Sequence, residues 1–249
     1  MQRRKFIQFS ALGSFVDGLS PSTVSDQLST NLVFLFQGDS ITDGNRGRSL
    51  DPNHIMGHGY VYSIASRIGA DFPENGFTFY NRGISGNTIS DLKKRWQTDT
   101  LDLKPDVLSI LIGINDANAQ IDNPIEATSI EQFEIIYREL LNDALQLNPN
   151  ILFVFNLPFV YPGSRVKDKL AIWEEDILKR QAVIRNLATT YNCILVDYNP
   201  MFAKVMKKTP IEYWIWDGIH PTVFAHELMA RLWIKEVSAK LKFLKSMKV

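Results

Sequence analysis

The sequence predicts an α/β protein whose parallel β-sheet is covered by helices on both faces. Two observations predict this class: short apolar runs of strand length recur along the chain, and stretches with helical periodicity separate them. Strands that alternate with helices form parallel sheets, because a parallel connection needs a crossover. A third observation concerns domains: no repeat, low-complexity tract or break in composition follows residue 31, so residues 31–249 are predicted to form one domain.

Five apolar runs are predicted as strands, each of a length that suits a strand buried on both faces. They span residues 32–36, 77–80, 107–112, 151–155 and 194–196. The helical stretches span residues 60–68, 89–96, 130–147, 173–189 and, at the end of the chain, 222–244. We expect a three-layer α/β/α sandwich with the flavodoxin-like strand order 2-1-3-4-5. In such a sheet, ligands bind at the carboxyl ends of the strands, where the order reverses between strands one and three.

The first 30 residues differ from the rest. Arg3, Arg4 and Lys5 precede a short, mildly apolar stretch, which is the order of a secretory signal, and the paired arginines resemble a twin-arginine export signal. The stretch is too short and too polar to span a bilayer as a helix. Residues 21–30 are rich in Ser and Thr and are predicted as a linker. The pattern favours export to the periplasm or beyond; the alternative is a basic tail on a cytoplasmic enzyme.

Composition excludes some classes of protein. Lys plus Arg and Asp plus Glu number 27 each, so the net charge is zero, whereas a nucleic-acid-binding protein needs a basic surface. The single cysteine, Cys193, excludes an internal disulfide and a cysteine-built metal site, and its apolar neighbours favour a core position over a reactive thiol. One set of C-terminal lysines is interpreted as a solvated helix face: Lys235, Lys240, Lys242, Lys245 and Lys248.

Polar residues and glycines follow the first three predicted strands. Strand one ends in Gly-Asp-Ser at Ser40, strand two leads into Gly83 and Gly86, and strand three leads into Asn115. Each motif has a structural alternative, since Gly-Asp-Ser and the glycines are common in turns and Asn115 suits a helix cap. The parallel topology, however, would bring all three loops to one crevice. Their convergence favours a functional site.

A fourth motif, Asp217-x-x-His220-Pro221, precedes the last helical stretch. Pro221 suits the first turn of that helix and would fix His220 at its N-terminal edge. A turn would bring the Asp217 carboxylate to the imidazole, leaving the other ring nitrogen free to accept a proton from a serine. Alone, an Asp-x-x-His pair is more often a cap or a surface arrangement. The remaining histidines have no comparable partner: His54, His58 and His226.

Together these four blocks resemble those of the SGNH/GDSL hydrolase family, in the family's order, over residues 32–235. Ser40 matches the family's nucleophile, Gly83 and Asn115 match its glycine and asparagine, and Asp217 and His220 match its Asp-x-x-His. The first block reads Gly-Asp-Ser-Ile instead of Gly-Asp-Ser-Leu, which keeps an apolar anchor after the serine.

The resemblance implies a serine esterase that needs no metal or organic cofactor. His220 would take the Ser40 proton, and Asp217 would fix the imidazole tautomer. The Ser40 and Gly83 backbone N–H groups and the Asn115 amide would hold the oxyanion. Two further residues beside the motifs are interpreted as structural hydrogen-bonding groups: Asp39 and Asn87.

Substrate is predicted from the sequence around the blocks, which resembles bacterial members linked to carbohydrate deacetylation. Tyr213, Trp214 and Trp216 are candidates for stacking on sugars, although clustered aromatic residues also serve as packing. We expect hydrolysis of short-acyl, acetyl esters on carbohydrate. A lysophospholipase or thioesterase on the same scaffold is the first alternative. More remote are a metallophosphoesterase, whose several metal ligands the sequence does not supply, and an inactive carbohydrate-binding domain.

Overall fold

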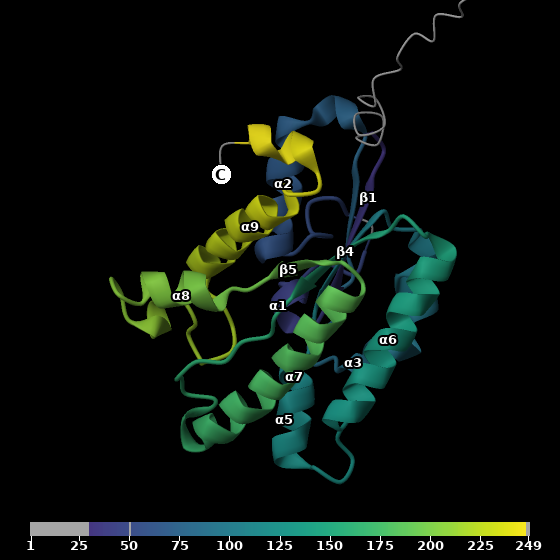
Figure 1. The fold of residues 1–249 in the computed structure, drawn as a ribbon. Helices are drawn as coiled ribbons and strands as arrows, with labels where there is room; N and C mark the ends of the chain where they lie inside the picture. The colour runs from purple at the N-terminus through teal and green to yellow at the C-terminus, as the bar shows by residue number, and fades with distance from the viewer. Residues whose placement is uncertain (1–29, 50, 248–249) are drawn as a thin grey trace, which may run out of the picture.

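The computed structural model describes residues 30–49 and 51–247. Within them, five parallel strands form one sheet in the order β2-β1-β3-β4-β5, which confirms the predicted topology. Figure 1 shows the sheet between its layers of helices. Every strand lies within two residues of its predicted position. The strands are β1 (Val33–Gly38), β2 (Thr78–Asn81), β3 (Val107–Leu111), β4 (Leu152–Asn156) and β5 (Ile194–Val196). The signal-like segment and linker predicted over residues 1–30 lie outside the described residues, Thr30 excepted, so export stays a prediction.

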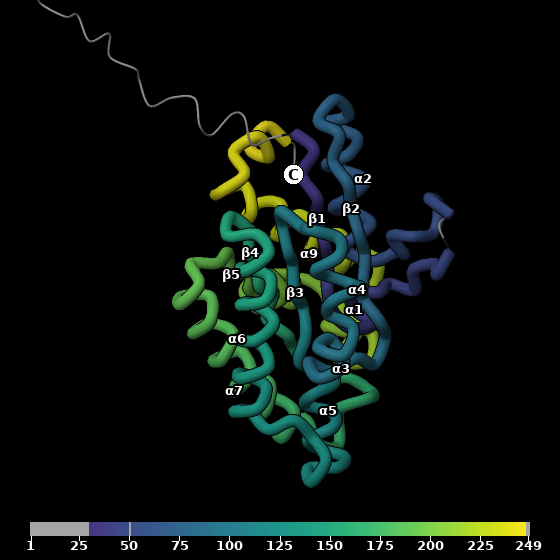
Figure 2. The backbone as a smooth tube through the Cα atoms, turned by 90° about the vertical axis from the view of Figure 1, so that its right-hand side faces the viewer, coloured from purple at the N-terminus to yellow at the C-terminus, as the bar shows by residue number. Residues whose placement is uncertain are grey.

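Helices cover both faces of the sheet. The bounds are α1 (Ser40–Asp43), α2 (Tyr60–Asp71), α3 (Ile89–Lys94), α4 (Trp96–Asp99), α5 (Ile114–Asp122), α6 (Ile130–Leu147), α7 (Leu170–Thr190), α8 (Asn199–Val205) and α9 (Val223–Val237). Short 3₁₀ turns lie at η1 (Pro73–Asn75), η2 (Leu101–Leu103), η3 (Lys167–Lys169), η4 (Ile211–Tyr213) and η5 (Lys242–Ser246). Helices α2 and α9 pack side by side on one face, and α6 lies beside α7 on the other, as the view turned by 90° also shows (Figure 2).

The strands supply two apolar cores because successive side chains point to opposite faces of the sheet. Phe34 and Phe36 of β1 belong to the core under α2 and α9, whereas Leu35 between them belongs to the core under α3, α6 and α7. Strand β4 alternates in the same way, with Val154 in the first core and Phe153 in the second. Burial on both faces explains why these strands are continuous apolar runs in the sequence.

The helix predictions failed at two places. The closing helix, predicted over residues 222–244, ends at Val237, and a turn connects it to η5. The stretch predicted as one helix over residues 89–96 is divided between α3 and α4 at Arg95, which leaves helical geometry. Its guanidinium donates hydrogen bonds to the Gln37, Asn87 and Asp99 side chains, so a tertiary contact overrides the local periodicity.

Helices α5 and α8 were missed by the periodicity. Helix α5 is largely polar, with the sequence INDANAQID, and α8 has seven residues beginning Asn-Pro, so neither carries an apolar stripe of useful length. None of the helices among the described residues is long and apolar enough to cross a membrane.

The residues predicted as core or surface lie largely as expected. Cys193 is half-buried beside the second core, and burial raises the pKa of its thiol to about 12, so it stays protonated at neutral pH. Of the five C-terminal lysines, Lys248 lies outside the described residues, and the other four are exposed. Only Lys235 lies on α9 itself, however, because the helix is shorter than predicted.

Candidate active site

Ser40 lies at the carboxyl end of β1, where the chain turns into α1. Asp39 caps this short helix: one carboxylate oxygen accepts a hydrogen bond from the Ile41 N–H at 3.0 Å. Asp39 is buried, and its contact confirms the predicted structural role. The cap fixes the turn on which Ser40 is the first helical residue, so the hydroxyl is presented at the edge of the sheet.

The Ser40 hydroxyl, the His220 imidazole and the Asp217 carboxylate form a continuous hydrogen-bonded chain. Ser40 Oγ lies 2.9 Å from His220 Nε2, and His220 Nδ1 lies 2.7 Å from Asp217 Oδ2. These are the contacts in which a histidine can accept the serine proton while a carboxylate orients the ring. The structure thus brings together three residues that are separated by up to 180 positions in the sequence.

The turn that carries His220 differs from the predicted one. Helix α9 begins at Val223, so Pro221 is not in its first turn; it pairs instead with Ile215 in an isolated antiparallel bridge. Asp217 closes the turn, because its Oδ1 accepts hydrogen bonds from the Ile219 N–H at 2.9 Å and the His220 N–H at 2.7 Å. One carboxylate therefore holds both the backbone and the ring of His220.

The hydrogen bonds around Asp217 decide its charge. Burial alone would raise the pKa of this carboxyl, but the donors from the His220 ring, the His220 N–H and the Ile219 N–H outweigh it and lower the pKa to about 2. Asp217 is therefore ionised at neutral pH. A fixed negative charge beside Nδ1 stabilises the imidazolium that forms when His220 takes a proton.

The loop after β2 is tied to α1 by side-chain hydrogen bonds. The Asn81 amide donates to the Thr42 carbonyl at 2.8 Å, and Asp43 accepts from the Ser85 N–H and hydroxyl at 2.9 and 3.0 Å. Gly83 lies between them, and a Cβ at this position would be 2.3 Å from the Asp43 nitrogen. Only glycine allows the loop this close to α1.

These contacts count against the predicted role of Gly83 in the oxyanion hole. Its N–H donates to Asn81 Oδ1 at 3.0 Å, and Gly83 does not line the cavity at Ser40. Gly86 does line that cavity, with a φ of +86° that favours glycine, and its N–H has no acceptor among the described residues. Both glycines follow the same strand, and the resemblance assigned the role to Gly83, because the sequence alone does not show which of the two lines the cavity.

Asn115 lines the same cavity, as predicted. It lies in the first turn of α5 and not at the cap, which is Gly113. Its amide donates to the Asn87 carbonyl at 3.1 Å, and the Asn87 side chain accepts from Arg95 Nε at 2.8 Å. Asn87 thus braces the loop after β2, as predicted. One of the two amide hydrogens of Asn115 is engaged in this contact, which leaves the other for a ligand.

The cavity at Ser40 has a volume of about 300 Å³. Ser40, Gly86, Asn115 and His220 line it together with five residues that the motifs did not predict: Ser85, Asn118, Arg165, Trp173 and Ile219. Ser85 and Ile219 are neighbours of the motifs, so their position in the sequence was a usable signal. Asn118 lies on α5, one turn after Asn115, whereas Arg165 lies in the loop between β4 and α7 and Trp173 lies on α7, two segments that carry no motif.

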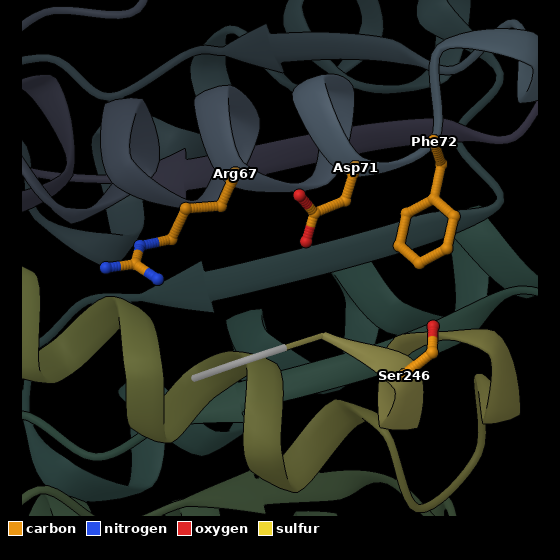
Figure 3. Close-up of a pocket in the computed structure, with 4 residues that line it drawn as sticks. All are labelled: Arg67, Asp71, Phe72 and Ser246. Atoms are coloured by element: carbon orange, nitrogen blue, oxygen red, sulfur yellow. The ribbon is translucent and has the colours of Figure 1, made fainter.

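A second cavity, of about 380 Å³, is larger but carries no catalytic arrangement (Figure 3). It lies at the C-terminal end of α2, and Ser40 does not line it. The lining residues are Arg67, Asp71, Phe72 and Ser246. The Arg67 guanidinium points away from Asp71 and pairs with Glu227, and the Ser246 hydroxyl donates to a backbone carbonyl. Chemistry and not volume therefore identifies the active site.

Three more ionisable side chains are buried in this part of the molecule, and none of them is hydrogen-bonded to the Ser40 or His220 side chain among the described residues. Burial raises the pKa of Asp39 to about 7 and that of Asp116 to about 6. Asp116 accepts hydrogen bonds from the Ile89 N–H at 3.1 and 3.2 Å. His226 is buried on α9, where its Nδ1 accepts from the Tyr60 N–H, and burial lowers its pKa to about 4. His226 is therefore a buried packing residue.

The predicted aromatic residues differ in exposure. Trp216 is 59% exposed and stacks on the His220 ring at 6.2 Å between centroids, so it lies at the rim of the site. Tyr213 is 45% exposed and stacks on Phe224, and Trp214 packs against Tyr213. Over the described residues, no group of three or more His, Cys, Asp or Glu side chains has a metal-binding arrangement.

Comparisons with known proteins agree with this geometry. Residues 36–228 match the model of the GDSL-like lipase/acylhydrolase family. The acetylxylan esterase of Geobacillus stearothermophilus is 34% identical over 213 residues, covering 82% of this chain and 92% of the esterase. Its solved structure, Axe2, has a TM-score of 0.73 at 32% identity, over 84% of this chain and 95% of that one.

Further solved structures point the same way. A protein of Parabacteroides merdae described as a GDSL-like lipase has a TM-score of 0.79 at 34% identity, over 86% of this chain and 98% of that one. For the Geobacillus esterase, two structures are of catalytic mutants in which a serine or an aspartate is replaced by alanine. This chain belongs to the GDSL-like lipase/acylhydrolase family and is a carboxylic ester hydrolase.

Proposed function

We propose that this esterase removes acetyl groups from carbohydrate through a Ser-His-Asp triad and an acyl-enzyme. The observation that carries the proposal is the unbroken chain of contacts from Ser40 Oγ through His220 to Asp217, at 2.9 and 2.7 Å, beside a cavity that is open to an ester. A nucleophile, a general base and an orienting carboxylate are the groups that acyl transfer requires.

Each residue of the triad has one role. His220 takes the proton from Ser40 as Oγ attacks the ester carbonyl, and it then gives that proton to the leaving alcohol. Asp217, ionised because its pKa is about 2, holds the imidazole in the tautomer with the proton on Nδ1 and stabilises the imidazolium. Water then attacks the acyl-enzyme by the same route and releases the carboxylic acid and free Ser40.

The oxyanion of the tetrahedral intermediate is proposed to accept three hydrogen bonds. The donors are the N–H groups of Ser40 and Gly86 and the second amide hydrogen of Asn115. The Ser40 and Gly86 N–H groups have no acceptor among the described residues, and both residues line the cavity with Asn115. Gly86 replaces the predicted Gly83, whose N–H is occupied by Asn81.

Three observations support a short acyl group on a sugar. The cavity, at about 300 Å³, has room for a small acyl group and part of a sugar, and its lining mixes hydroxyl and amide groups with Trp173. Trp216 offers an exposed aromatic face beside His220, and aromatic faces stack on the apolar faces of sugars. The 34% identical relative is an acetylxylan esterase.

Rates on 4-nitrophenyl acetate and 4-nitrophenyl octanoate test the acyl length. We expect faster hydrolysis of the acetate, because the cavity offers no long apolar channel, and a clear preference for the octanoate would contradict the proposal. Ser40→Ala should abolish turnover, and a fluorophosphonate should inactivate the protein by reacting at Ser40.

A panel of natural esters tests the carbohydrate assignment: acetylated xylan, acetylated pectin, a lysophospholipid and an acyl thioester. Acetate release from the polysaccharides should exceed hydrolysis of the other two compounds. The reverse result would favour a lysophospholipase or a thioesterase. Activity that survives EDTA would argue against a metallophosphoesterase.

A further inference from the structure

Arg165 differs from every other arginine that the structure describes. The guanidinium groups of the other nine are bound to protein oxygen atoms by hydrogen bonds or ion pairs. Among the described residues, the Arg165 side chain forms neither, although Asp168 lies only three positions away. Arg165 is also the residue whose side chain lines the cavity with Ser40 and His220. Arg165 is exposed, so its guanidinium is free to bind a ligand in this cavity.

The position of Arg165 is fixed by the catalytic loop. Its backbone N–H donates to the Asp217 carbonyl at 3.0 Å, and the Tyr161 N–H donates to the Gly218 carbonyl at 2.9 Å. The segment that carries Arg165 is therefore held against the turn of the triad aspartate. Because the backbone is anchored in this way, the Arg165 side chain begins beside the turn that carries Asp217 and His220.

The rest of the lining favours an anion. None of the nine residues that line the cavity is an aspartate or a glutamate, and Asp39 and Asp217 are buried beneath it. Ser85, Asn115 and Asn118 offer neutral hydrogen-bonding groups, and Trp173 forms an apolar wall. A guanidinium binds a carboxylate through two parallel hydrogen bonds, a geometry that few other side chains match.

We infer that Arg165 selects esters whose alcohol part carries a carboxylate, namely acetylated uronic acids. This inference rests on the function proposed above. An acetyl group carries no charge, so the anion that pairs with Arg165 belongs to the sugar and not to the acyl group. Arg165 is then a specificity-determining residue, which contacts the leaving alcohol and takes no part in proton transfer.

The test compares two substrates that differ only in charge. One is a methyl glucuronoside with a single acetyl group, and the other is the matching uronamide, which is neutral and of the same size. For the unaltered protein, kcat/KM for acetate release should be about tenfold higher on the uronate, because a charge-assisted pair is lost with the amide. Arg165→Gln should bring this ratio to about one, and Arg165→Lys should keep part of it.

Lys167→Gln is the matched control, since Lys167 is an exposed cation in the same segment that does not line the cavity. It should leave the ratio unchanged, and an equal loss in this variant would overturn the inference in favour of a diffuse electrostatic effect. Thermal melting of Arg165→Gln, which should match that of the unaltered protein, separates a lost contact from a lost fold.

A phosphate is the other anion that a guanidinium binds well. Acetylglycerol phosphate and acetylglycerol form the second pair of substrates, and a larger Arg165-dependent ratio on this pair would overturn the assignment to uronic acids. The inference and the function on which it rests fail differently. If the protein does not hydrolyse 4-nitrophenyl acetate, the proposed esterase function is contradicted. If it hydrolyses this ester but has equal kcat/KM on the uronate and the uronamide, only the role of Arg165 is contradicted.

Discussion

One aspartate, Asp39, directly precedes Ser40, and another, Asp217, is hydrogen-bonded to His220, and the same carboxyl group behaves differently in each place. Asp39 and Asp217 are both buried, with 1% and 3% of their surface exposed. The pKa of Asp39 is nevertheless raised to about 7, whereas that of Asp217 is lowered to about 2. Burial works in the same direction at both positions, so burial alone does not explain the difference.

The Asp217 carboxyl is surrounded less completely by protein, so burial raises its pKa less, and it also accepts more hydrogen bonds. Asp217 accepts from the Ile219 N–H, the His220 N–H and the His220 ring, all at 2.7–2.9 Å. Asp39 accepts from the Ile41 N–H at 3.0 Å, and its carboxyl also interacts unfavourably with buried Asp116. A buried carboxylate keeps its charge when several donors replace the lost water. Asp217 is therefore suited to electrostatic work, whereas Asp39 serves as a helix cap.

Replacing each aspartate by asparagine is the strongest test of this division. Asp217→Asn should lower kcat by about 10⁴-fold, because the amide presents N–H where the imidazole needs an acceptor and favours the wrong tautomer. Turnover of 4-nitrophenyl acetate under saturating conditions measures the loss.

Asp39→Asn, at the residue before Ser40, is the matched control. The amide oxygen still accepts from the Ile41 N–H, so kcat should stay within about tenfold of the unaltered protein. Equal losses in the two variants would contradict the division between an electrostatic and a capping carboxyl group.

The adjacent residues Asn115 and Asp116 extend the comparison to the loop after β3. Asn115 lines the cavity, whereas the Asp116 carboxyl is buried and accepts from the Ile89 N–H. Asn115→Ala should lower kcat by about 10²–10³-fold, because one oxyanion donor is lost, with a much smaller change in melting temperature. Asp116→Ala should show the reverse pattern, a loss of stability that exceeds its effect on kcat at permissive temperature. Steady-state kinetics and thermal melting on both variants would show whether the two roles are separate.

The sequence predicts the sheet from local pattern and topology, and it assigns the candidate catalytic residues through their resemblance to the family's blocks. Apolar runs mark strands that are buried on both faces, and the ends of neighbouring parallel strands meet at one edge. This topology explains why Ser40 and Asn115 line one cavity, and the Asp-x-x-His motif marks the turn that carries Asp217 and His220.

Other features depend on tertiary contacts that no local pattern records. Gly83 and Gly86 follow the same strand, and only the contact between Gly83 and α1 shows that Gly83 is the packing residue. The break between α3 and α4 results from side-chain contacts of Arg95 with distant residues. Arg165 reaches the cavity on a loop between β4 and α7, where neither periodicity nor a motif marks it.

The smallest expected effect is the dependence of stability on pH, and it separates the two carboxyl groups by sign. Because the pKa of Asp39 rises from 3.8 to about 7 on folding, the native state holds a proton that the unfolded chain has released between these values. The free energy of unfolding should therefore fall as pH rises through this range, by about 2 kcal/mol between pH 4.5 and pH 6. Asp39→Asn should not show this part of the decrease, because asparagine does not titrate.

Urea unfolding of both proteins at the two pH values measures the difference, which contains the titration of Asp39 and its interaction with Asp116. Curves that shift equally with pH would contradict the raised pKa of Asp39. Asp217 should act in the opposite direction: its pKa falls from 3.8 to about 2 on folding, so its contribution to stability is present above pH 3.8 and is lost as pH falls towards 2. The same protein should then lose stability through Asp39 as pH rises towards 7 and through Asp217 as pH falls towards 2. The opposite pKa shifts of the two carboxyl groups require this.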